Sequence, residues 1–472
     1  MTHMADAGTA TFTQGSLMRH VTVMSLTASI GLMAIFIVDL VDIFFISLLG
    51  IGALAAAAGY ASMVMFFASA INIGLSIAAG ALVAQALGAG RRDEAREMAS
   101  SVAVVSVMAG VAVPVLALPN LGFLLGLLGA EGEVAAQAAL YVRIILPTTM
   151  ISGVGMVAVA TLRAHGDARG AMYPALLGGL VNGVADPILI FGLGLGLPGA
   201  AMATVVARFV TLAMALWLAQ RKYRAFARPC LRCVRRDLSR SAGIGVPAVL
   251  ATVATPVGAA IVTRQMAQFG TDAVAGLAVI NRLIPVAFSV ILALSGAIGP
   301  IIGQNFGAAR LDRVREAFLD GILFVAVYVF AVAGLLYLLR AEIAAVFDLQ
   351  EAGLTLLLLF CGPLALASFF NGVIFVANAS FNNLGHPGYS TWVNWGRHTL
   401  GTWPFAIWGA QSWGAPGVLI GQAAGGAVFA AIAAFLAVRV MARPDAPPAD
   451  PVMFGNGCPN RRMQVLFGRR NR

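Results

Sequence analysis

The sequence predicts an all-α polytopic membrane protein with twelve transmembrane helices arranged as two six-helix lobes. Three observations lead to this fold class: an apolar composition, twelve apolar segments, and a repeat that relates the two halves of the chain. Of the 472 residues, 60% are hydrophobic and only 11% are charged, whereas a soluble chain is about a quarter charged. Such a composition is typical of a protein embedded in a lipid bilayer.

Each apolar segment is long enough for a spanning helix, which needs about 20 mainly apolar residues. The N-terminus lacks the short apolar core and small-residue cleavage site of a secretory signal peptide, so we expect the first segment to be the first spanning helix. The twelve predicted spans cover residues 20–49, 52–84, 97–118, 134–162, 171–193, 199–220, 240–268, 273–305, 316–339, 353–381, 388–410 and 414–441.

Basic residues are distributed unequally between the predicted loops. Arginine concentrates in every second loop, including Arg163 between the fourth and fifth spans, and in the tail after Met441, whereas the other loops carry mainly acids. Basic loops stay on the cytoplasmic side of a membrane. We therefore expect a multi-pass protein of the inner (plasma) membrane with both termini in the cytoplasm. This topology accounts for the net charge of +10, and we predict no nucleic-acid partner.

The repeat relates "GALVAQALGAGRRDEARE" (Gly80–Glu97) to "GPIIGQNFGAARLDRVRE" (Gly299–Glu316). From Gln85 onward, seven residues recur at one offset of 219, which a chance pair of glycine-stopped helix ends does not explain. Both copies follow an even-numbered span, so the halves have parallel topology, as in several transporter folds. The predicted organisation is a cytoplasmic N-terminus (1–19), an N-lobe (20–220), a basic connector (221–239), a C-lobe (240–441) and a basic, disordered cytoplasmic tail (442–472).

Three carboxylates interrupt the predicted spans of the first half. Asp39 and Asp42 lie in the first span, within "FIVDLVDIFFI", and Asp186 lies in the fifth. The three-residue step places Asp39 and Asp42 on one helix face, about 5 Å apart, where desolvation and repulsion disfavour two negative charges. Intramembrane acids usually mark an ion or proton path, and a buried helix–helix contact is the alternative. Such a pair can load a proton, or hold Na⁺ with neutral oxygens.

Other polar groups of the first half accompany these acids. Asn182 lies four residues before Asp186, on the same helix face. Pro187 frees a backbone carbonyl and can bend the helix there. We expect these groups to meet Asp42 in an outward-facing pocket. Met33 is a candidate for an adaptable substrate cavity, although packing in the membrane core explains it as well.

Motifs for other chemistry are missing from the sequence. There is no phosphate-binding loop, and the histidines form no metal set. Cys230 and Cys233 form a C-x-x-C without the second ligand pair that a zinc site needs. We therefore predict neither an enzyme nor an ATP-driven exporter, and no cofactor besides a coupling ion.

Several stretches, in order, resemble the multidrug and toxic compound extrusion (MATE) transporters. They are "VDIFFISLLGIGALAAAA", the repeated "VAQALGAGRRDEAR" and "IGQNFGAARLDRVR", "NGVADPILIFGLGLGLPGAAMAT" and "FNNLGHPGYS". The resemblance implies a V-shaped pair of lobes that exports drugs in exchange for H⁺ or Na⁺, with a cation site in the N-lobe. Thr204 matches a polar member of that site, as Asp42, Asn182 and Asp186 do, and Tyr141 matches a fourth-span tyrosine. These matches resemble the DinF-like branch, from which Asp39 departs, because related sequences often carry Asn there.

The sequence thus predicts a monomeric secondary antiporter of the lipid bilayer that exports small amphipathic or cationic drugs in exchange for H⁺ or Na⁺. The predicted residues for proton coupling, Na⁺ binding and substrate contact are Asp39, Asp42, Asp186, Asn182, Thr204, Tyr141 and Met33. One alternative is a lipid-linked oligosaccharide flippase of the same superfamily, with a large central cavity and essential arginines. Another is a lipid-modifying membrane enzyme, with clustered polar or metal-binding motifs at one membrane face.

Overall fold

The computed structural model describes residues 10–48, 52–347, 349 and 351–442, and for several residues between 39 and 55 it describes the backbone alone. Parts of the predicted N-terminus and tail, residues 1–9 and 443–472, therefore lie outside the described residues. All regular structure in the described ranges is helical, which confirms the predicted all-α fold. The α-helices are α1 (Leu17–Leu48), α2 (Gly52–Gly88), α3 (Arg92–Ala117), α4 (Leu121–Leu127), α5 (Gly132–Ile145), α6 (Thr149–Ala164), α7 (Ala168–Pro187), α8 (Leu197–Tyr223), α9 (Leu231–Met266), α10 (Thr271–Ala287), α11 (Ser289–Gly307), α12 (Leu311–Leu338), α13 (Arg340–Phe347), α14 (Glu351–Cys361), α15 (Ser368–Asn383), α16 (Gly388–His398) and α17 (Trp403–Ala442).

The described chain crosses the bilayer twelve times. Eleven of its stretches are long and apolar enough to span a membrane, and the last of them, Gly388–Ala442, has 55 residues. Within α17 the backbone leaves helical geometry at Trp413 and Gly414. Beyond this point Gly417 lies against Gly409, although eight residues of continuous helix would separate them by about 12 Å. The chain therefore reverses there, and the last stretch contains two spans.

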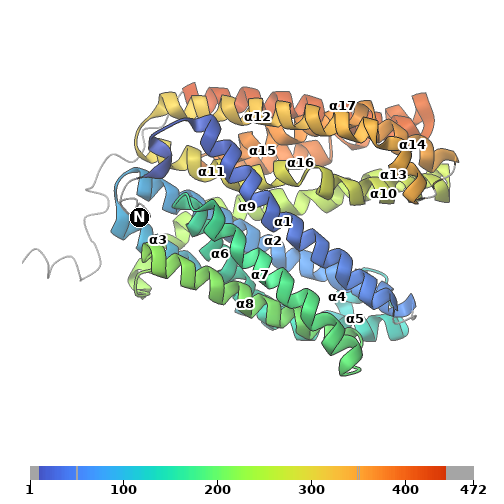
Figure 1. Ribbon diagram of the computed structural model, residues 1–472, viewed down its shortest axis with the longest axis horizontal. Coiled ribbons are helices and arrows are strands. Elements are labelled where there is room, and N and C mark those ends of the chain that lie inside the picture. Colours follow the sequence, from blue (N-terminus) through green and yellow to red (C-terminus); the bar gives the residue numbers. More distant parts are fainter. Residues whose placement is uncertain (1–9, 49–51, 348, 350, 443–472) are drawn as a thin grey trace, which may run out of the picture.

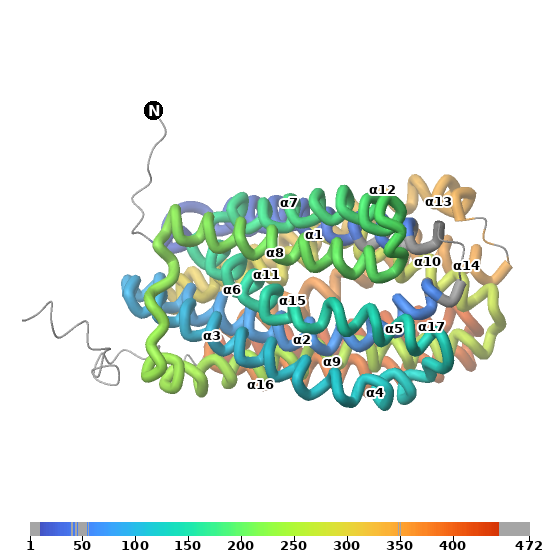
Figure 2. Tube along the Cα trace, turned by 90° about the horizontal axis from the view of Figure 1, so that it is seen from below, coloured from blue at the N-terminus to red at the C-terminus, as the bar shows by residue number. Residues whose placement is uncertain are grey.

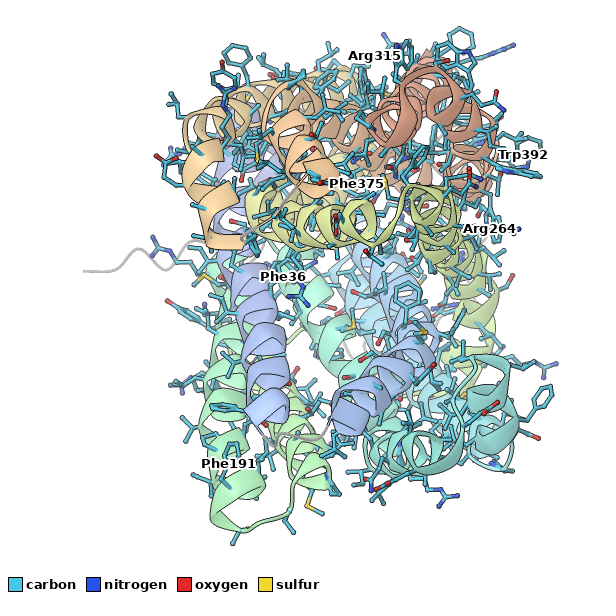
Figure 3. All side chains as sticks on the ribbon, turned by 90° about the vertical axis from the view of Figure 1, so that its right-hand side faces the viewer. Phe36, Phe191, Arg264, Arg315, Phe375 and Trp392 are labelled. Atoms are coloured by element: carbon cyan, nitrogen blue, oxygen red, sulfur yellow. The ribbon has the colours of Figure 1, made fainter. Side chains whose placement is uncertain are left out.

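The helices form two groups. Figure 1 shows α1–α8 and α10–α17 lying close together at the end that holds the N-terminus and separating towards the other end. We call the groups the first and second lobes, and the two ends the closed end and the open end. Seen from below in Figure 2, the long helices run side by side along the horizontal axis. Viewed from the open end in Figure 3, Phe36 of α1 lies between the lobes.

Two helices connect the lobes by packing. α1 packs on α7 of its own lobe and also on α11 and α12 of the second lobe. α9 packs on α2 and α3 of the first lobe and on α16 and α17 of the second. The predicted connector, 221–239, overlaps α9, which begins at Leu231. The helix begins this early because buried Asp237 accepts a hydrogen bond from Ser101 (2.7 Å) and pairs with Arg236 (2.7 Å).

Four spans that the sequence predicts as continuous are broken, and one of them is the eleventh, which breaks between α16 and α17. The fourth consists of α5 and α6, joined by a 3-10 turn that contains Pro147. The eighth breaks at Phe288, between α10 and α11. The tenth breaks between α14 and α15, where a 3-10 turn begins at Pro363. Proline lacks the N–H that continues a helix and clashes with the preceding turn, which accounts for the breaks beside Pro147 and Pro363.

The two copies of the sequence repeat meet at the closed end. Gly88, the last residue of α2, lies against the backbone carbonyl of Gln304, and Gly307, the last residue of α11, lies against that of Gln85. A side chain at either glycine would collide with the opposite backbone. The repeat therefore forms the contact that closes this end of the molecule.

The segment Thr11–Thr13, a 3-10 turn, covers the same end. The Phe12 ring is buried. The backbone N–H of Phe12 donates to the Gln304 side chain (2.8 Å), and the backbone carbonyl of Phe12 accepts from the Asn305 side chain (3.1 Å). On the first lobe, the Thr11 hydroxyl donates to the carbonyl of His165 (3.2 Å). Burial lowers the pKa of that histidine. The segment thus contacts both lobes where they converge.

Candidate functional site

The packing of α1 on α7 sets which side chains face each other. Gly31 lies against Met172 and Ala175, and further along Val38 lies against Gly179. The helices run in parallel, with offsets of 175 − 31 = 144 and 179 − 38 = 141 residues. The same register brings Asp42, near the end of α1, level with Asp186, near the end of α7.

The Asp42 and Asp186 carboxyl groups are close enough to interact electrostatically. Asp186 is fully buried and Asp42 is half-buried. Neither Asp42 Oδ1 nor either oxygen of Asp186 has a hydrogen-bond partner among the described residues. Two carboxyl groups can share a hydrogen bond only when one of them holds a proton, and a monovalent cation relieves their repulsion in the same way. The geometry therefore suits one bound positive charge.

The helix around Asp186 departs from regular geometry. Pro187 ends α7, and a single π-helical turn, Ile188–Gly192, follows. Such turns occur at functional sites more often than elsewhere. Asn182, one turn before Asp186, is buried, and its Nδ2 finds no acceptor among the described residues. The polar face of α7 thus leaves hydrogen-bonding capacity unused.

Tyr141 and Thr204 complete one side of this cluster. The Tyr141 hydroxyl, from α5, lies near the Thr204 side chain on α8 and interacts electrostatically with both aspartates. The Thr204 hydroxyl donates to the Ala200 carbonyl (3.1 Å). Helices α1, α5, α7 and α8 together supply the four side chains.

Arg208, which the sequence analysis did not consider, places a cation beside Tyr141. It lies one turn after Thr204 on α8 and interacts electrostatically with Tyr141. Its guanidinium donates to the Thr148 hydroxyl (2.8 Å) and to the Ile145 carbonyl (3.2 Å), at the break between α5 and α6. An arginine inside a predicted span was the available signal.

The remaining predicted residues are placed differently. Met33 is 38% exposed and lies nine residues, or about 13 Å along the helix, before Asp42, so the structure does not bring it into the cluster. The side chain of Asp39 lies outside the described residues. The roles assigned to these two residues stay predictions.

A second polar region is a cavity of about 350 Å³ between the lobes. Its walls come from α2 and α6 of the first lobe, from α11, α15 and α16 of the second, and from α9, which packs on both lobes. Arg163, predicted to be a loop charge, lies instead in the last turn of α6 and lines this cavity, because the helix continues to Ala164. Other polar residues in the lining include Ser76, Thr252, Asn378, Asn383 and Asn394.

Comparison with known proteins gives consistent results. The profile of the family MatE matches residues 27–188 and 247–405. An FAD transporter of Shewanella oneidensis is 28% identical over 410 residues, 84% of this chain and 89% of that protein. The multidrug export protein MepA of Staphylococcus haemolyticus is 26% identical over 339 residues, 70% and 73% of the two chains.

Solved structures share the fold. An outward-facing multidrug resistance MATE family transporter of the MOP superfamily superposes with a TM-score of 0.84 at 24% identity, over 92% of this chain and 98% of its own. A Vibrio cholerae MATE transporter has a TM-score of 0.84 at 25% identity, over 90% and 99% of the two chains. These likenesses confirm the predicted arrangement of twelve spans in two lobes.

Proposed function

Because this chain belongs to the MatE family, we propose that it is a secondary active multidrug efflux antiporter. It exports amphipathic or cationic organic compounds in exchange for H⁺, with Na⁺ as the alternative coupling ion. Relatives named as multidrug export proteins support this activity, and another relative is named an FAD transporter. The resemblance to the family found in the sequence is confirmed, whereas membership of its DinF-like branch stays a prediction.

The observation that carries the proposal is the pairing of Asp42 with Asp186. The two carboxyl groups interact with each other in a buried site, so a single bound proton removes the repulsion between two negative charges. Releasing that proton restores the second negative charge, which is costly in a site with little water. The protonated and unprotonated forms therefore favour different packing of α1 on α7. A bound ion shifts a conformational equilibrium only through such differential affinity.

The bend after Asp186 supports this coupling. Pro187 and the π-turn Ile188–Gly192 give α7 a point at which it can change direction. An inward proton gradient supplies about 1.4 kcal/mol per pH unit, and a membrane potential about 2.3 kcal/mol per charge per 100 mV. These energies are sufficient to move the population of a two-state transporter by tenfold or more.

The alternative ion, Na⁺, would be held by oxygen ligands. Asp42, Asp186 and Thr204 offer carboxylate and hydroxyl oxygens, and Asn182 offers an amide oxygen. The two carboxyl groups can hold a proton without further ligands, which favours H⁺ as the coupling ion. No cofactor or enzymatic activity belongs to this proposal. We place the monomer in the inner membrane with the closed end and both termini in the cytoplasm, following the distribution of basic residues.

A lipid-linked oligosaccharide flippase remains the alternative function. It would require a large central cavity with essential arginines. The cavity between the lobes has about 350 Å³ and one arginine in its described lining, which is small for a lipid-linked sugar chain. Drug efflux by the purified protein decides between the two.

The experiment is efflux of a panel of cationic dyes from proteoliposomes with independently imposed pH and Na⁺ gradients. We expect a pH gradient alone to drive efflux by the wild type, and Asp42→Asn and Asp186→Asn to abolish gradient-driven efflux in folded protein. Asp272→Asn, at an exposed residue, is the matched control and should behave as wild type. Gradient-driven efflux by Asp42→Asn at the wild-type rate would refute the proposed coupling.

A further inference from the structure

The cavity between the lobes differs in charge from the acidic cluster. Arg163 is the one charged side chain in its described lining, and no acid lines it there. The Arg163 guanidinium extends from α6 of the first lobe to Gly296 on α11 of the second, where any side chain at position 296 would collide with its Nη1. The glycine thus leaves room for the cation between the lobes.

The polar atoms of this cavity have unused hydrogen-bonding capacity of both kinds. Arg163 Nε is a buried donor without an acceptor among the described residues. Asn378 Oδ1 and Asn383 Oδ1, on α15, are buried acceptors without donors in the same part of the chain. The Asn383 amide orientation is set by its Nδ2, which donates to the Ala379 carbonyl (2.9 Å). Buried polar groups are normally paired, so turning these side chains towards a polar ligand in the cavity would satisfy atoms that have no partner now.

Apolar residues form the rest of the lining. Ile73 and Ile77 of α2 face the cavity, as do Leu292 of α11 and Phe375 of α15, which is labelled on the second lobe in Figure 3. A volume of about 350 Å³ lies within the range of small-molecule pockets. A ligand that fills it therefore has an apolar or planar body besides its polar groups.

We propose that this cavity binds organic anions: Arg163 takes a carboxylate or phosphate group, and the asparagines of α15 accept from N–H or O–H groups of the same ligand. An organic cation would instead meet the positive charge of Arg163 with no acid nearby to compensate it. The cavity and the acidic cluster thus accept opposite charges. The proposal rests on the export function above, since it names a substrate class for that transporter, but binding is measurable without transport.

Two flavins provide the test, because FMN is riboflavin with one added phosphate group. Their binding to the full chain in neutral detergent can be followed by flavin fluorescence anisotropy. We expect the wild type to bind FMN at least tenfold more tightly than riboflavin. Arg163→Gln should bring the FMN affinity down to that of riboflavin and leave riboflavin binding unchanged, whereas Arg163→Lys should keep part of the preference. Exposed Arg169→Gln, on the next helix, is the control and should keep all of it.

A structural role of Arg163 at the end of α6 would weaken both flavins equally, so the ratio of the two affinities separates the roles. Asn378→Asp is a second variant, for the case in which Arg163→Gln does not fold. The added negative charge should weaken FMN relative to riboflavin and strengthen a cationic dye. The proposal is overturned by equal affinities in the wild type, by an FMN preference that survives Arg163→Gln, or by failure of both flavins to bind. Asp42→Asn should still bind FMN, so loss of coupling and loss of this site are distinguishable.

Discussion

The side-chain amide of Gln85 donates a hydrogen bond of 2.9 Å to the backbone carbonyl of Asn383 in the opposite lobe. Gln304 makes the equivalent bond, of 2.7 Å, to Ala164. The donors are 304 − 85 = 219 residues apart and the acceptors are 383 − 164 = 219 residues apart. The closed end is therefore held by two equivalent hydrogen bonds, one donated by the first lobe to the second and one donated by the second lobe to the first.

Removing both glutamine contacts should open this end more often. Each hydrogen bond contributes about 1 kcal/mol, so Gln85→Ala with Gln304→Ala should shift the equilibrium towards the inward-open form by up to about 30-fold. Electron–electron resonance distances between spin labels at positions 92 and 310 would report the shift. Gln268→Ala, whose side chain bonds to Gln265 within its own lobe, should leave the distance distribution unchanged.

A bulky side chain in the glycine contact should prevent closure. Gly88→Leu would collide with the Gln304 backbone, and Gly307→Leu with that of Gln85. We expect either variant to reduce dye efflux at least tenfold while substrate binding persists. Gly59→Ala, on the same helix as Gly88 but with nothing near it, serves as control. Normal efflux by both leucine variants would contradict the assigned role of the contact.

Arg208 should affect both stability and coupling. Arg208→Gln removes charged hydrogen bonds to Thr148 and Ile145, each worth about 1.5–3 kcal/mol, and should lower the melting temperature. It also removes the positive charge beside Tyr141, which itself interacts with Asp42 and Asp186. Proton binding at the aspartates should then become more favourable, and half-maximal transport should move to higher pH. Arg208→Lys, which keeps the charge, should move that midpoint less. An unchanged pH profile in Arg208→Gln would place the arginine outside the coupling site.

The second arm of α17 packs through glycines against its first arm and against the turn that precedes the helix. Gly425 lies against the backbone of Gly401, whereas its neighbour Gly426 has nothing within 4 Å. Gly425→Leu should therefore destabilise the protein by more than 3 kcal/mol, and Gly426→Ala should have little effect. Thermal unfolding of the two variants in detergent would measure the difference.

The N-terminal turn should slow opening of the closed end. Phe12→Ala removes a buried ring and loosens the backbone that Gln304 and Asn305 hold. We expect faster hydrogen exchange in the last turns of α11 and α6 and unchanged exchange in α8. Equal exchange in the wild type and Phe12→Ala would show that the turn has no such role.

Much of the fold follows from the sequence, because apolar segment length and the 219-residue repeat are strong physical signals. The breaks beside Pro147 and Pro363 were not predicted, since a proline in a span indicates a kink or a break without distinguishing them. The sequence analysis expected Asp42 and Asp186 to meet because a buried acid is costly and usually belongs to an ion path. The roles of the two residues stay predictions. Arg163 was assigned to a loop because a single arginine next to a predicted loop fits the distribution of basic residues expected on the cytoplasmic side. The cavity that it lines could not be predicted, because six helices, α2, α6, α9, α11, α15 and α16, come together to form it.

The closed end draws equally on both halves of the chain, but the acidic pair belongs to the first half alone. A variant that loses only the two acids should therefore still open and close at the closed end, but an ion gradient should no longer drive transport. It should behave as a facilitator, in which substrate runs down its own concentration difference in either direction and accumulates on neither side. The same conformational change would then export a drug when it is coupled to proton binding and let the drug equilibrate across the membrane when it is not.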